Sequence, residues 1–361
     1  MYSSFIARNF RCFRELEIDN FGRINLITGK NNVGKSALLE ALFLHCGAYN
    51  PFLALRLNSF RGVEKAKVDF AEQGEAPWDS LFNDFDTSRF IELVGDFKRL
   101  NGRILWLKAI KNPGDLANIY PLIYRHSTEA TTSATSPEAV KVLELEFKQG
   151  KKHGSFYLIL EPDGTIRPQP LAPPPSFPAF YQPSRMRVSV QEEGERFGNL
   201  EKQGLTNILV DALRIIEPRL KRLVMIYETN QPVLYGDIGK KVLIRTSLMG
   251  EGMTRLISLV LLLANAKNGV VLIDEIENGL HHSVMQRVWQ ALTEVARKFN
   301  AQVFATTHSH ECIIAAYEAF KNNKPNDFRL HRLEMSNEDI KAITYSPATM
   351  KAAIEADLEL R

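Results

Sequence analysis

Apolar and polar residues follow two different periods along this chain, and the periods predict strands close to its N-terminus. Short apolar or alternating runs at residues 5–7, 16–18 and 24–28 predict three strands. Leu38, Leu39, Leu42 and Phe43 then recur at helical spacing, which predicts a helix over residues 36–45. A glycine-rich segment separates the third strand from this helix. The local order is therefore strand, loop, helix.

The C-terminal half repeats this alternation of strands and helices. Its predicted helices cover residues 203–216, 253–265 and 283–298. Its predicted strands cover residues 224–227, 242–245, 269–274 and 302–306. The last two are continuous apolar runs, as expected for buried parallel strands, and the tail reads as mixed strand and helix. Both ends of the chain together predict an α/β fold around one mixed sheet.

The middle of the chain has a different pattern, which predicts an inserted α+β region. Strands are expected at 90–109 around a turn at 100–102, and at 140–147 and 156–160. Residues 127–137 are low in complexity and predict a loop, and seven of the 17 prolines lie in 168–183, an extended linker. We expect three parts: 1–84, an insertion over 85–200 with its proline-rich linker, and 201–361.

Composition narrows the class of protein. The 361 residues are 45% hydrophobic and 24% charged, as in a folded globular chain, and a net charge of +3 argues against nucleic-acid binding by bulk charge. The three cysteines have neither metal nor redox spacing, which favours a reducing compartment. The longest apolar run, 256–264, is about half a membrane span, and no secretory signal is visible. We expect a cytoplasmic protein without membrane contact.

The glycine-rich segment carries the strongest chemical signal. Residues 29–36 read Gly-Lys-Asn-Asn-Val-Gly-Lys-Ser and fit the phosphate-binding pattern G-x-x-x-x-G-K-S completely. In that pattern the backbone curls around phosphate oxygens, the lysine reaches the β- and γ-phosphates, and the serine hydroxyl binds Mg²⁺. The expected nucleotide-binding residues are Gly29, Asn31, Asn32, Gly34, Lys35, Ser36 and Ala37.

Two later strands end in residues that complete such a site. Asp274 and Glu275 follow the apolar run 270–273, so both carboxylates are expected at the ligand-binding edge of the sheet. Asp274 would hold Mg²⁺ directly or through water, and Glu275 would orient or deprotonate the attacking water. His308 follows the strand 302–306 and could bond the γ-phosphate or that water. Arg8, Arg11 and Arg14 form a basic edge near the nucleotide, a DNA contact or a solvated strand face.

In this order the motifs resemble ABC-type ATPases, and within them the SMC, RecF and OLD branch. The opening Asn9-Phe10-Arg11, the loop Gly29-Lys30-Asn31-Asn32 and the segment 275–281 look like that branch's elements. The resemblance covers roughly residues 1–60 and 200–320. It implies an ATPase head in two parts, 1–84 and 201–361, with ATP and Mg²⁺ bound and Lys35, Glu275 and His308 as catalytic residues.

The resemblance also implies a signature loop, and residues 247–252 are the candidate. Ser247, Gly250 and Gly252 are the expected contacts, although the loop departs from the family pattern and matching its glycines puts Met249 where a serine belongs. A plain helix N-cap is the other interpretation. No glutamine matches the family's Q-loop convincingly; Gln73 is a weak candidate.

A single set of motifs implies a partner. In the family two subunits enclose two ATP molecules head to tail, so we expect a homodimer. We expect neither coiled-coil arms nor a C-terminal Toprim domain. The chain resembles stand-alone ATPases that control a separate effector, such as a Toprim-type nuclease, in DNA repair or antiphage defence. DNA is a further expected partner. The alternatives are the ATPase subunit of a membrane transporter and a nucleotide-binding scaffold that does not hydrolyse ATP.

Overall fold

The structure is a computed structural model of the 361-residue chain. It describes residues 1–62, 76–98, 100–111, 140–186, 188–322, 327–337, 339–356 and 359–360, together with Leu116 and Ile119. The expected loop 127–137 and Gln73 lie outside these residues.

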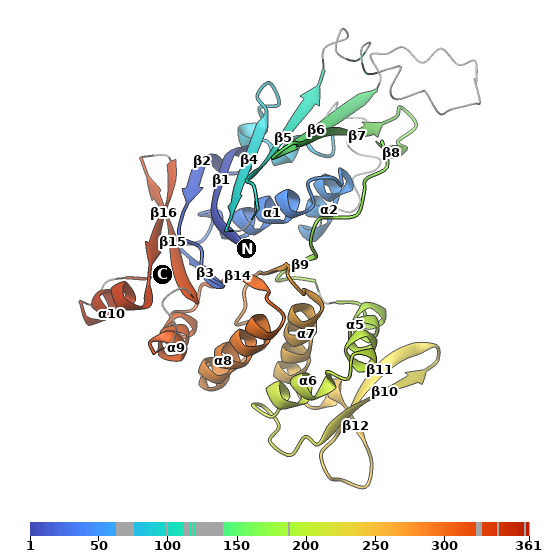
Figure 1. Ribbon diagram of the computed structural model, residues 1–361, viewed down its shortest axis with the longest axis vertical. Helices are drawn as coiled ribbons and strands as arrows, with labels where there is room; N and C mark the ends of the chain where they lie inside the picture. Colours follow the sequence, from blue (N-terminus) through green and yellow to red (C-terminus); the bar gives the residue numbers. More distant parts are fainter. Residues whose placement is uncertain are drawn as a thin grey trace.

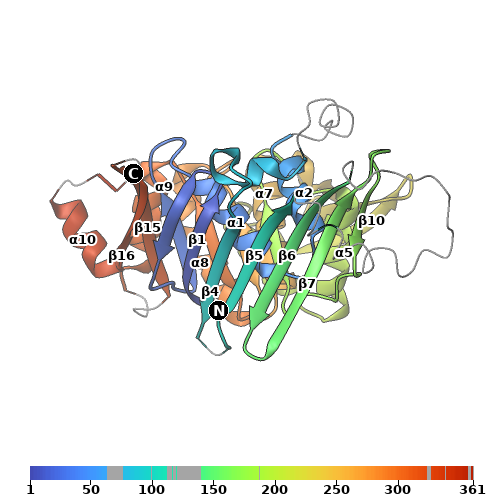
Figure 2. The ribbon, with the colours of Figure 1, turned by 90° about the horizontal axis from the view of Figure 1, so that it is seen from above.

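An antiparallel sheet forms one layer of the molecule (Figures 1 and 2). Its strands, in spatial order, are β2 (Phe13–Ile18), β1 (Tyr2–Phe10), β4 (Ile91–Phe97), β5 (Arg103–Ile110), β6 (Lys141–Gln149), β7 (Lys152–Leu160) and β8 (Ile166–Gln169). Alternating burial along β4 and β5 reflects one face on the core and one toward solvent. The middle of the chain therefore extends a sheet that the N-terminal strands begin.

A second sheet carries the parallel strands. Its spatial order is β16 (Asp339–Tyr345), β15 (Phe328–Ser336), β3 (Ile24–Thr28), β14 (Gln302–Thr306), β13 (Val270–Ile273) and β9 (Ala179–Gln182). All neighbours in it are parallel except β15 and β16. Strands β3, β13 and β14 are buried at every position, which explains their continuous apolar sequences.

Helices fill the space between the sheets and cover the outer face of the second one (Figure 1). Helix α1 (Lys35–Cys46) lies between the sheets, where residues 37–46 are all buried. The remaining helices are α2 (Phe52–Phe60), α5 (Val190–Lys202), α6 (Thr206–Leu213), α7 (Glu251–Asn265), α8 (His282–Lys298), α9 (His310–Phe320) and α10 (Pro347–Glu355). One hydrophobic core surrounds α1, and another lies between the parallel strands and helices α6 to α9.

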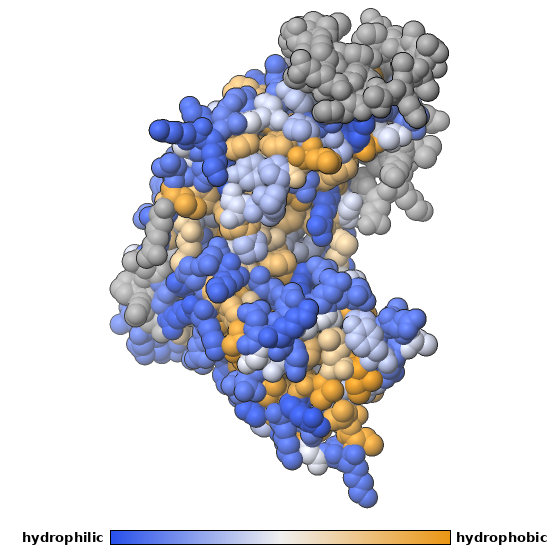
Figure 3. Space-filling view, turned by 45° about the vertical axis from the view of Figure 1, so that its right-hand side comes forward, coloured by the Kyte–Doolittle hydropathy of each residue, from blue (hydrophilic) through white to orange (hydrophobic). Residues whose placement is uncertain are grey.

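A small sheet lies beside α5 and α6 at the other end of the molecule from the antiparallel sheet (Figure 1). It consists of β10 (Arg222–Glu228), β11 (Gln231–Asp237) and β12 (Ile244–Arg245). Figure 3 shows hydrophobic residues on the surface toward this end. Exposed apolar side chains there include Ile226, Tyr227, Val242 and Leu248.

The α/β fold predicted from the sequence is confirmed, as are the N-terminal strands and the helices at α1, α7 and α8. The proline-rich stretch 168–183 is not only a linker, because its last residues form β9 in the parallel sheet. Helices α2 and α5 and strand β11 were not predicted. The division into parts at residues 84 and 200 stays a prediction. No helix among the described residues is long and apolar enough to cross a membrane.

Candidate nucleotide-binding site

The parallel sheet brings four loops to one edge. Strands β3, β14, β13 and β9 are neighbours that run in the same direction, so the residues that follow their carboxyl ends meet. These residues are the loop from Gly29, His308, Asp274 and the segment 183–186. Open α/β sheets bind ligands at this edge.

The loop after β3 has the backbone of a phosphate-binding loop. Gly29 and Gly34 have φ values of 139° and 94°, and a Cβ on Gly29 would lie 2.4 Å from the carbonyl oxygen of Leu333. Glycine is therefore required at both positions. Gly34 caps α1 without a side-chain hydrogen bond, and the first turn holds no acidic residue. The first N–H groups of the helix are thus available to an anion.

Lys35 lies in the curve of this loop. Its Nζ donates to the carbonyl oxygens of Gly29 at 2.7 Å and Lys30 at 2.9 Å. Burial lowers the pKa of Lys35, while Asp274 and Glu275 raise it. A phosphate group would add further negative charge and favour the charged ammonium.

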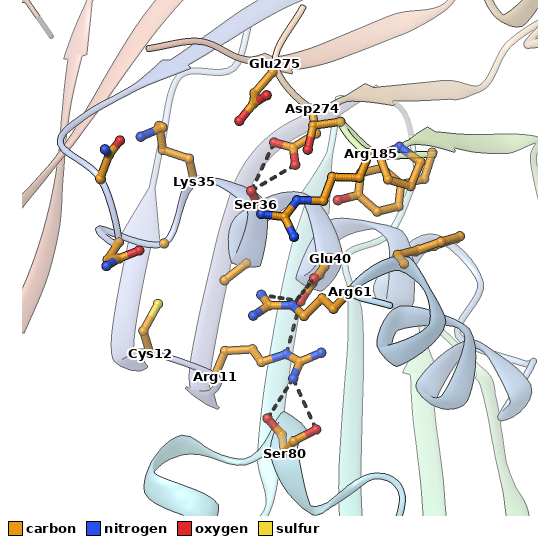
Figure 4. A pocket seen from close by; sticks show the side chains of 18 of the residues that line it. Arg11, Cys12, Lys35, Ser36, Glu40, Arg61, Ser80, Arg185, Asp274 and Glu275 are labelled. Atoms are coloured by element: carbon orange, nitrogen blue, oxygen red, sulfur yellow. Dashed lines mark hydrogen bonds and ion pairs between the residues drawn. The ribbon is translucent and has the colours of Figure 1, made fainter. Parts of the chain in front are cut away.

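Ser36 and Asp274 meet across the cleft (Figure 4). The Ser36 hydroxyl lies 3.0 Å from both carboxylate oxygens of Asp274. The Thr306 hydroxyl donates to Asp274 at 2.6 Å and accepts from the backbone N–H of Glu275 at 2.8 Å. Burial raises the pKa of Asp274, and the bonds from Thr306 and Ser36 oppose that rise. The Ser36 hydroxyl and the Asp274 carboxylate lie side by side, and oxygen ligands of this kind suit Mg²⁺.

Glu275 is fixed by its neighbours rather than left free. Its φ is 50°, an uncommon value for a side-chain-bearing residue. Its carboxylate accepts from the Asn278 side chain at 2.7 Å. Arg255 on α7 donates to the Glu275 carbonyl oxygen at 3.2 Å. The backbone strain and these bonds together hold the carboxylate at the cleft.

His308 is bound to Glu277. Its backbone N–H donates to the Glu277 carboxylate at 3.0 Å, and its Nδ1 lies 3.2 Å from the same oxygen. His308 thus stands at the carboxyl end of β14, as expected, but it does not line the cleft that contains Lys35 and Asp274.

The cleft has a volume of about 1060 Å³. Asn31, Asn32, Gly34, Lys35, Ser36 and Ala37 line it together with Asp274 and Glu275. The candidate signature residues Ser247, Gly250 and Gly252 do not. The two glycines flank Glu251 at the start of α7, where Gly252 packs against Gly279.

The wall of the cleft holds a buried ion cluster that sequence reasoning missed. Glu40 on α1, only 2% exposed, accepts from Arg11 at 3.1 Å and from Arg61 at 2.7 Å. Arg11 also donates to Asn58 and Ser80. The cluster joins the β1–β2 turn, α1 and α2. Of the three N-terminal arginines, Arg11 lines the cleft and Arg8 pairs with Glu15 and Glu92.

The segment after β9 was also missed, and it adds Pro183, Ser184 and Arg185 to the cleft. Gln182 ends β9, and its carbonyl oxygen accepts from the N–H of Asp274 at 2.9 Å. Its side chain is 3% exposed and donates to the carbonyl oxygen of Met186 at 2.6 Å. The signal in the sequence is weak, because a four-residue strand between prolines looks like a linker.

Comparisons with known proteins agree with this geometry. Residues 24–313 match the family described as "AAA domain, putative AbiEii toxin, Type IV TA system". An ATP/GTP phosphatase of Helicobacter pylori is 24% identical over 354 residues, which cover 87% of this chain and 86% of that protein. An uncharacterized protein of Methanocaldococcus jannaschii is 48% identical over 52 residues, 14% of this chain and 24% of that protein.

Among solved structures, an Smc head bound to the C-winged helix domain of ScpA shares the fold. It superimposes with a TM-score of 0.51 at 13% identity, over 97% of this chain and 99% of that chain. The fold of an ABC-type P-loop ATPase head, as in the SMC branch, is therefore confirmed.

Proposed function

The chain belongs to the family described as "AAA domain, putative AbiEii toxin, Type IV TA system", and on this basis we propose that it binds and hydrolyses ATP with Mg²⁺. The proposal depends mainly on one observation: Ser36, in the phosphate-binding loop, contacts Asp274. Asp274 directly precedes Glu275 in the sequence, so a metal-binding group and a proton acceptor lie side by side. The relative named an ATP/GTP phosphatase supports the same activity.

The proposed roles follow from the positions of the side chains. The first turn of α1 and Lys35 bind the phosphates, with Lys35 exchanging its two carbonyl partners for phosphate oxygens. Ser36 and Asp274 would hold Mg²⁺, which when bound withdraws negative charge from the phosphate oxygens.

Hydrolysis needs one proton acceptor. The water oxygen forms a bond to the γ-phosphorus while the bond from that phosphorus to the β–γ bridging oxygen breaks. Glu275 takes the proton that the water loses, and ADP leaves with the electron pair of the broken bond. Asn278 orients the Glu275 carboxylate through its 2.7 Å bond. His308, held by Glu277, would approach the γ-phosphate only after a movement of its loop.

We further propose that two copies complete the site head to tail. Ser247 and Gly250 are exposed and lie outside the cleft of their own chain. Leu248, between them, is 76% exposed, so a partner that covered it would remove apolar surface from water. A second copy that sets this loop against the phosphates would bury Leu248. ATP would then act as a bridge, and its hydrolysis would reopen the dimer.

The output we propose is control of a separate effector, such as a Toprim-type nuclease, in antiphage defence or DNA repair, with DNA as a further partner. The family description, which names a toxin–antitoxin system, supports a defence role. Plasmid cutting by the purified chain that persists in the Lys35→Ala variant would contradict this division of labour.

The activity is tested by phosphate release from Mg-ATP. Lys35→Ala should abolish ATP binding, and Glu275→Gln should keep binding while slowing release about 100-fold or more. Lys351→Ala and Glu318→Gln, two exposed positions on α10 and α9, are the matched controls and should behave like the wild type. ATP binding without any phosphate release by the wild type would favour the scaffold that does not hydrolyse ATP.

A further inference from the structure

The segment between β9 and α5 brings a positive charge to the cleft from a wall that the sequence motifs do not cover. Strand β9 is the parallel neighbour of β13, with Gln182 opposite Ile273. Residues 183–186 therefore leave the sheet at the same edge as Asp274. Pro183, Ser184 and Arg185 all line the cleft.

The side chain of Gln182 stabilises the turn that follows β9. The Gln182 side chain is buried and donates to the carbonyl oxygens of Met186 at 2.6 Å and Pro183 at 3.4 Å. Gln182 itself does not line the cleft. The bond to Met186 closes the turn and leaves Arg185 on the side of the cleft.

Arg185 extends into the cleft. Figure 4 shows its side chain pointing toward Ser36 and Asp274, with Lys35 on the opposite side of that pair. The Arg185 side chain is exposed, and within the part of the chain that the structure describes it has no hydrogen bond or ion pair to a protein group. Its N–H donors are therefore available to a ligand in the cleft.

The other cations around the cleft already have protein partners. Arg11 and Arg61 bind Glu40, and Arg255 binds the carbonyl oxygens of Asp274 and Glu275. Lys35 is the cation of the phosphate-binding loop. A triphosphate carries more negative charge than Lys35 and a divalent cation neutralise, and a planar guanidinium matches two phosphate oxygens at once.

We propose that Arg185 binds the terminal phosphate of the nucleotide, within the same chain and from the side opposite Lys35. This inference rests on the proposed ATPase function and adds a residue to it. As the bond to the bridging oxygen breaks, negative charge moves onto the departing β-phosphate and the transferred group. An arginine that binds this charge stabilises the transition state more than the bound ATP, so it raises kcat as well as affinity.

The test compares two nucleotides in the full-length protein. Titration calorimetry with Mg²⁺ and either the non-hydrolysable analogue AMP-PNP or ADP measures the two affinities, and phosphate release measures kcat. Arg185→Ala should weaken AMP-PNP binding about tenfold, leave ADP binding unchanged and lower kcat about 100-fold. Arg185→Lys keeps the charge without the planar fork, so it should restore AMP-PNP binding in part and kcat hardly at all.

The matched control is Met186→Ala, which removes a neighbouring exposed side chain but keeps the carbonyl that Gln182 binds. It should match the wild type. Equal weakening of AMP-PNP and ADP by Arg185→Ala, or no change in either, would overturn the inference. If Arg185→Ala does not fold, the same comparison is made with Arg185→Gln. A wild type that binds neither nucleotide would instead overturn the proposed function itself.

Discussion

At the scale of single residues, neutral hydrogen-bond donors hold the acidic groups of the site in place. Thr306 and Ser36 bind the carboxylate of Asp274, and Asn278 binds that of Glu275. Neutral donors fix a carboxylate without neutralising its charge, so it is still able to attract a divalent cation or a proton. Asp274 is buried, and burial raises its pKa above the ordinary value of 3.8. The ionised carboxylate of Asp274 is therefore unfavourable for the stability of the fold, but it is the form that binds a divalent cation.

The replacement Asp274→Asn should make the protein inactive but more stable. A carboxyl group with a raised pKa keeps its proton more tightly in the folded than in the unfolded chain. As pH rises above 3.8, its ionisation therefore lowers the free energy of unfolding. The asparagine avoids that loss, so we expect a gain of about 1 to 2 kcal/mol at pH 7, shrinking as pH falls toward 4. Urea unfolding without Mg²⁺ at pH 7 and pH 5 measures it.

Asp237→Asn serves as the control with the opposite sign. The Gly239 N–H lowers the pKa of the partly buried Asp237, so ionisation of Asp237 stabilises the fold above the unfolded pKa. Asp237→Asn removes that charge and should lower the free energy of unfolding. A less stable Asp274→Asn at pH 7 would show that the bonds from Ser36 and Thr306 outweigh burial.

At the scale of elements, α1 is enclosed by both sheets, and a buried arginine holds its C-terminal end. Arg103 on β5, 0% exposed, donates to the carbonyl oxygens of His45 and Cys46 at 3.0 and 3.2 Å. Its guanidinium also lies over the rings of Tyr49 and Phe177. The helix that starts the phosphate site is thus anchored at its far end by the antiparallel sheet.

Removing this anchor should destabilise the whole molecule. Arg103→Ala leaves two helix-terminal carbonyl groups buried without partners, and we expect a loss of about 3 kcal/mol in the free energy of unfolding. Arg222→Ala, which removes the ion pair between the exposed Arg222 and the partly buried Asp237, should lose about 0 to 1 kcal/mol. Urea unfolding of both variants decides the matter. Equal effects of the two changes would contradict the anchoring role.

The elements that the sequence predicts well are those with a continuous or periodic apolar pattern. Strands β3, β13 and β14 and helix α1 are buried nearly throughout, so their composition alone reveals them. Strand β9 is not predicted because it has only four residues and lies beside prolines. Its role depends on pairing with β13, about 90 residues later in the sequence. Helix α5 escapes because most of its residues are polar.

The residues of the site also fall into two groups, those that a local sequence motif predicts and those that only the fold brings together. The phosphate-binding loop, Asp274 and Glu275 are contiguous motifs at strand ends, and the structure brings them to one edge as expected. The cluster of Arg11, Glu40 and Arg61 joins three distant segments through side chains, and no local pattern encodes such a meeting. Arg185 is hidden for the same reason, since only the pairing of β9 with β13 places it at the cleft.

At the scale of the whole molecule, we propose that the chain presents half of a composite site. One edge of the parallel sheet carries the phosphate-binding groups, while Ser247, Leu248 and Gly250 are exposed and lie outside the cleft. A head-to-tail dimer would set the loop of one copy against the cleft of the other, twice. We propose that ATP joins two copies in this way.

The most direct test is the solution mass of Glu275→Gln by light scattering after size exclusion, with and without Mg-ATP. Slow hydrolysis should trap the closed state, so we expect a shift from monomer to dimer only when Mg-ATP is present. The double variant Glu275→Gln/Leu248→Asp should bind ATP and stay monomeric, because a carboxylate would be buried at the interface. A Glu275→Gln protein that binds ATP and stays monomeric at every concentration would contradict the account.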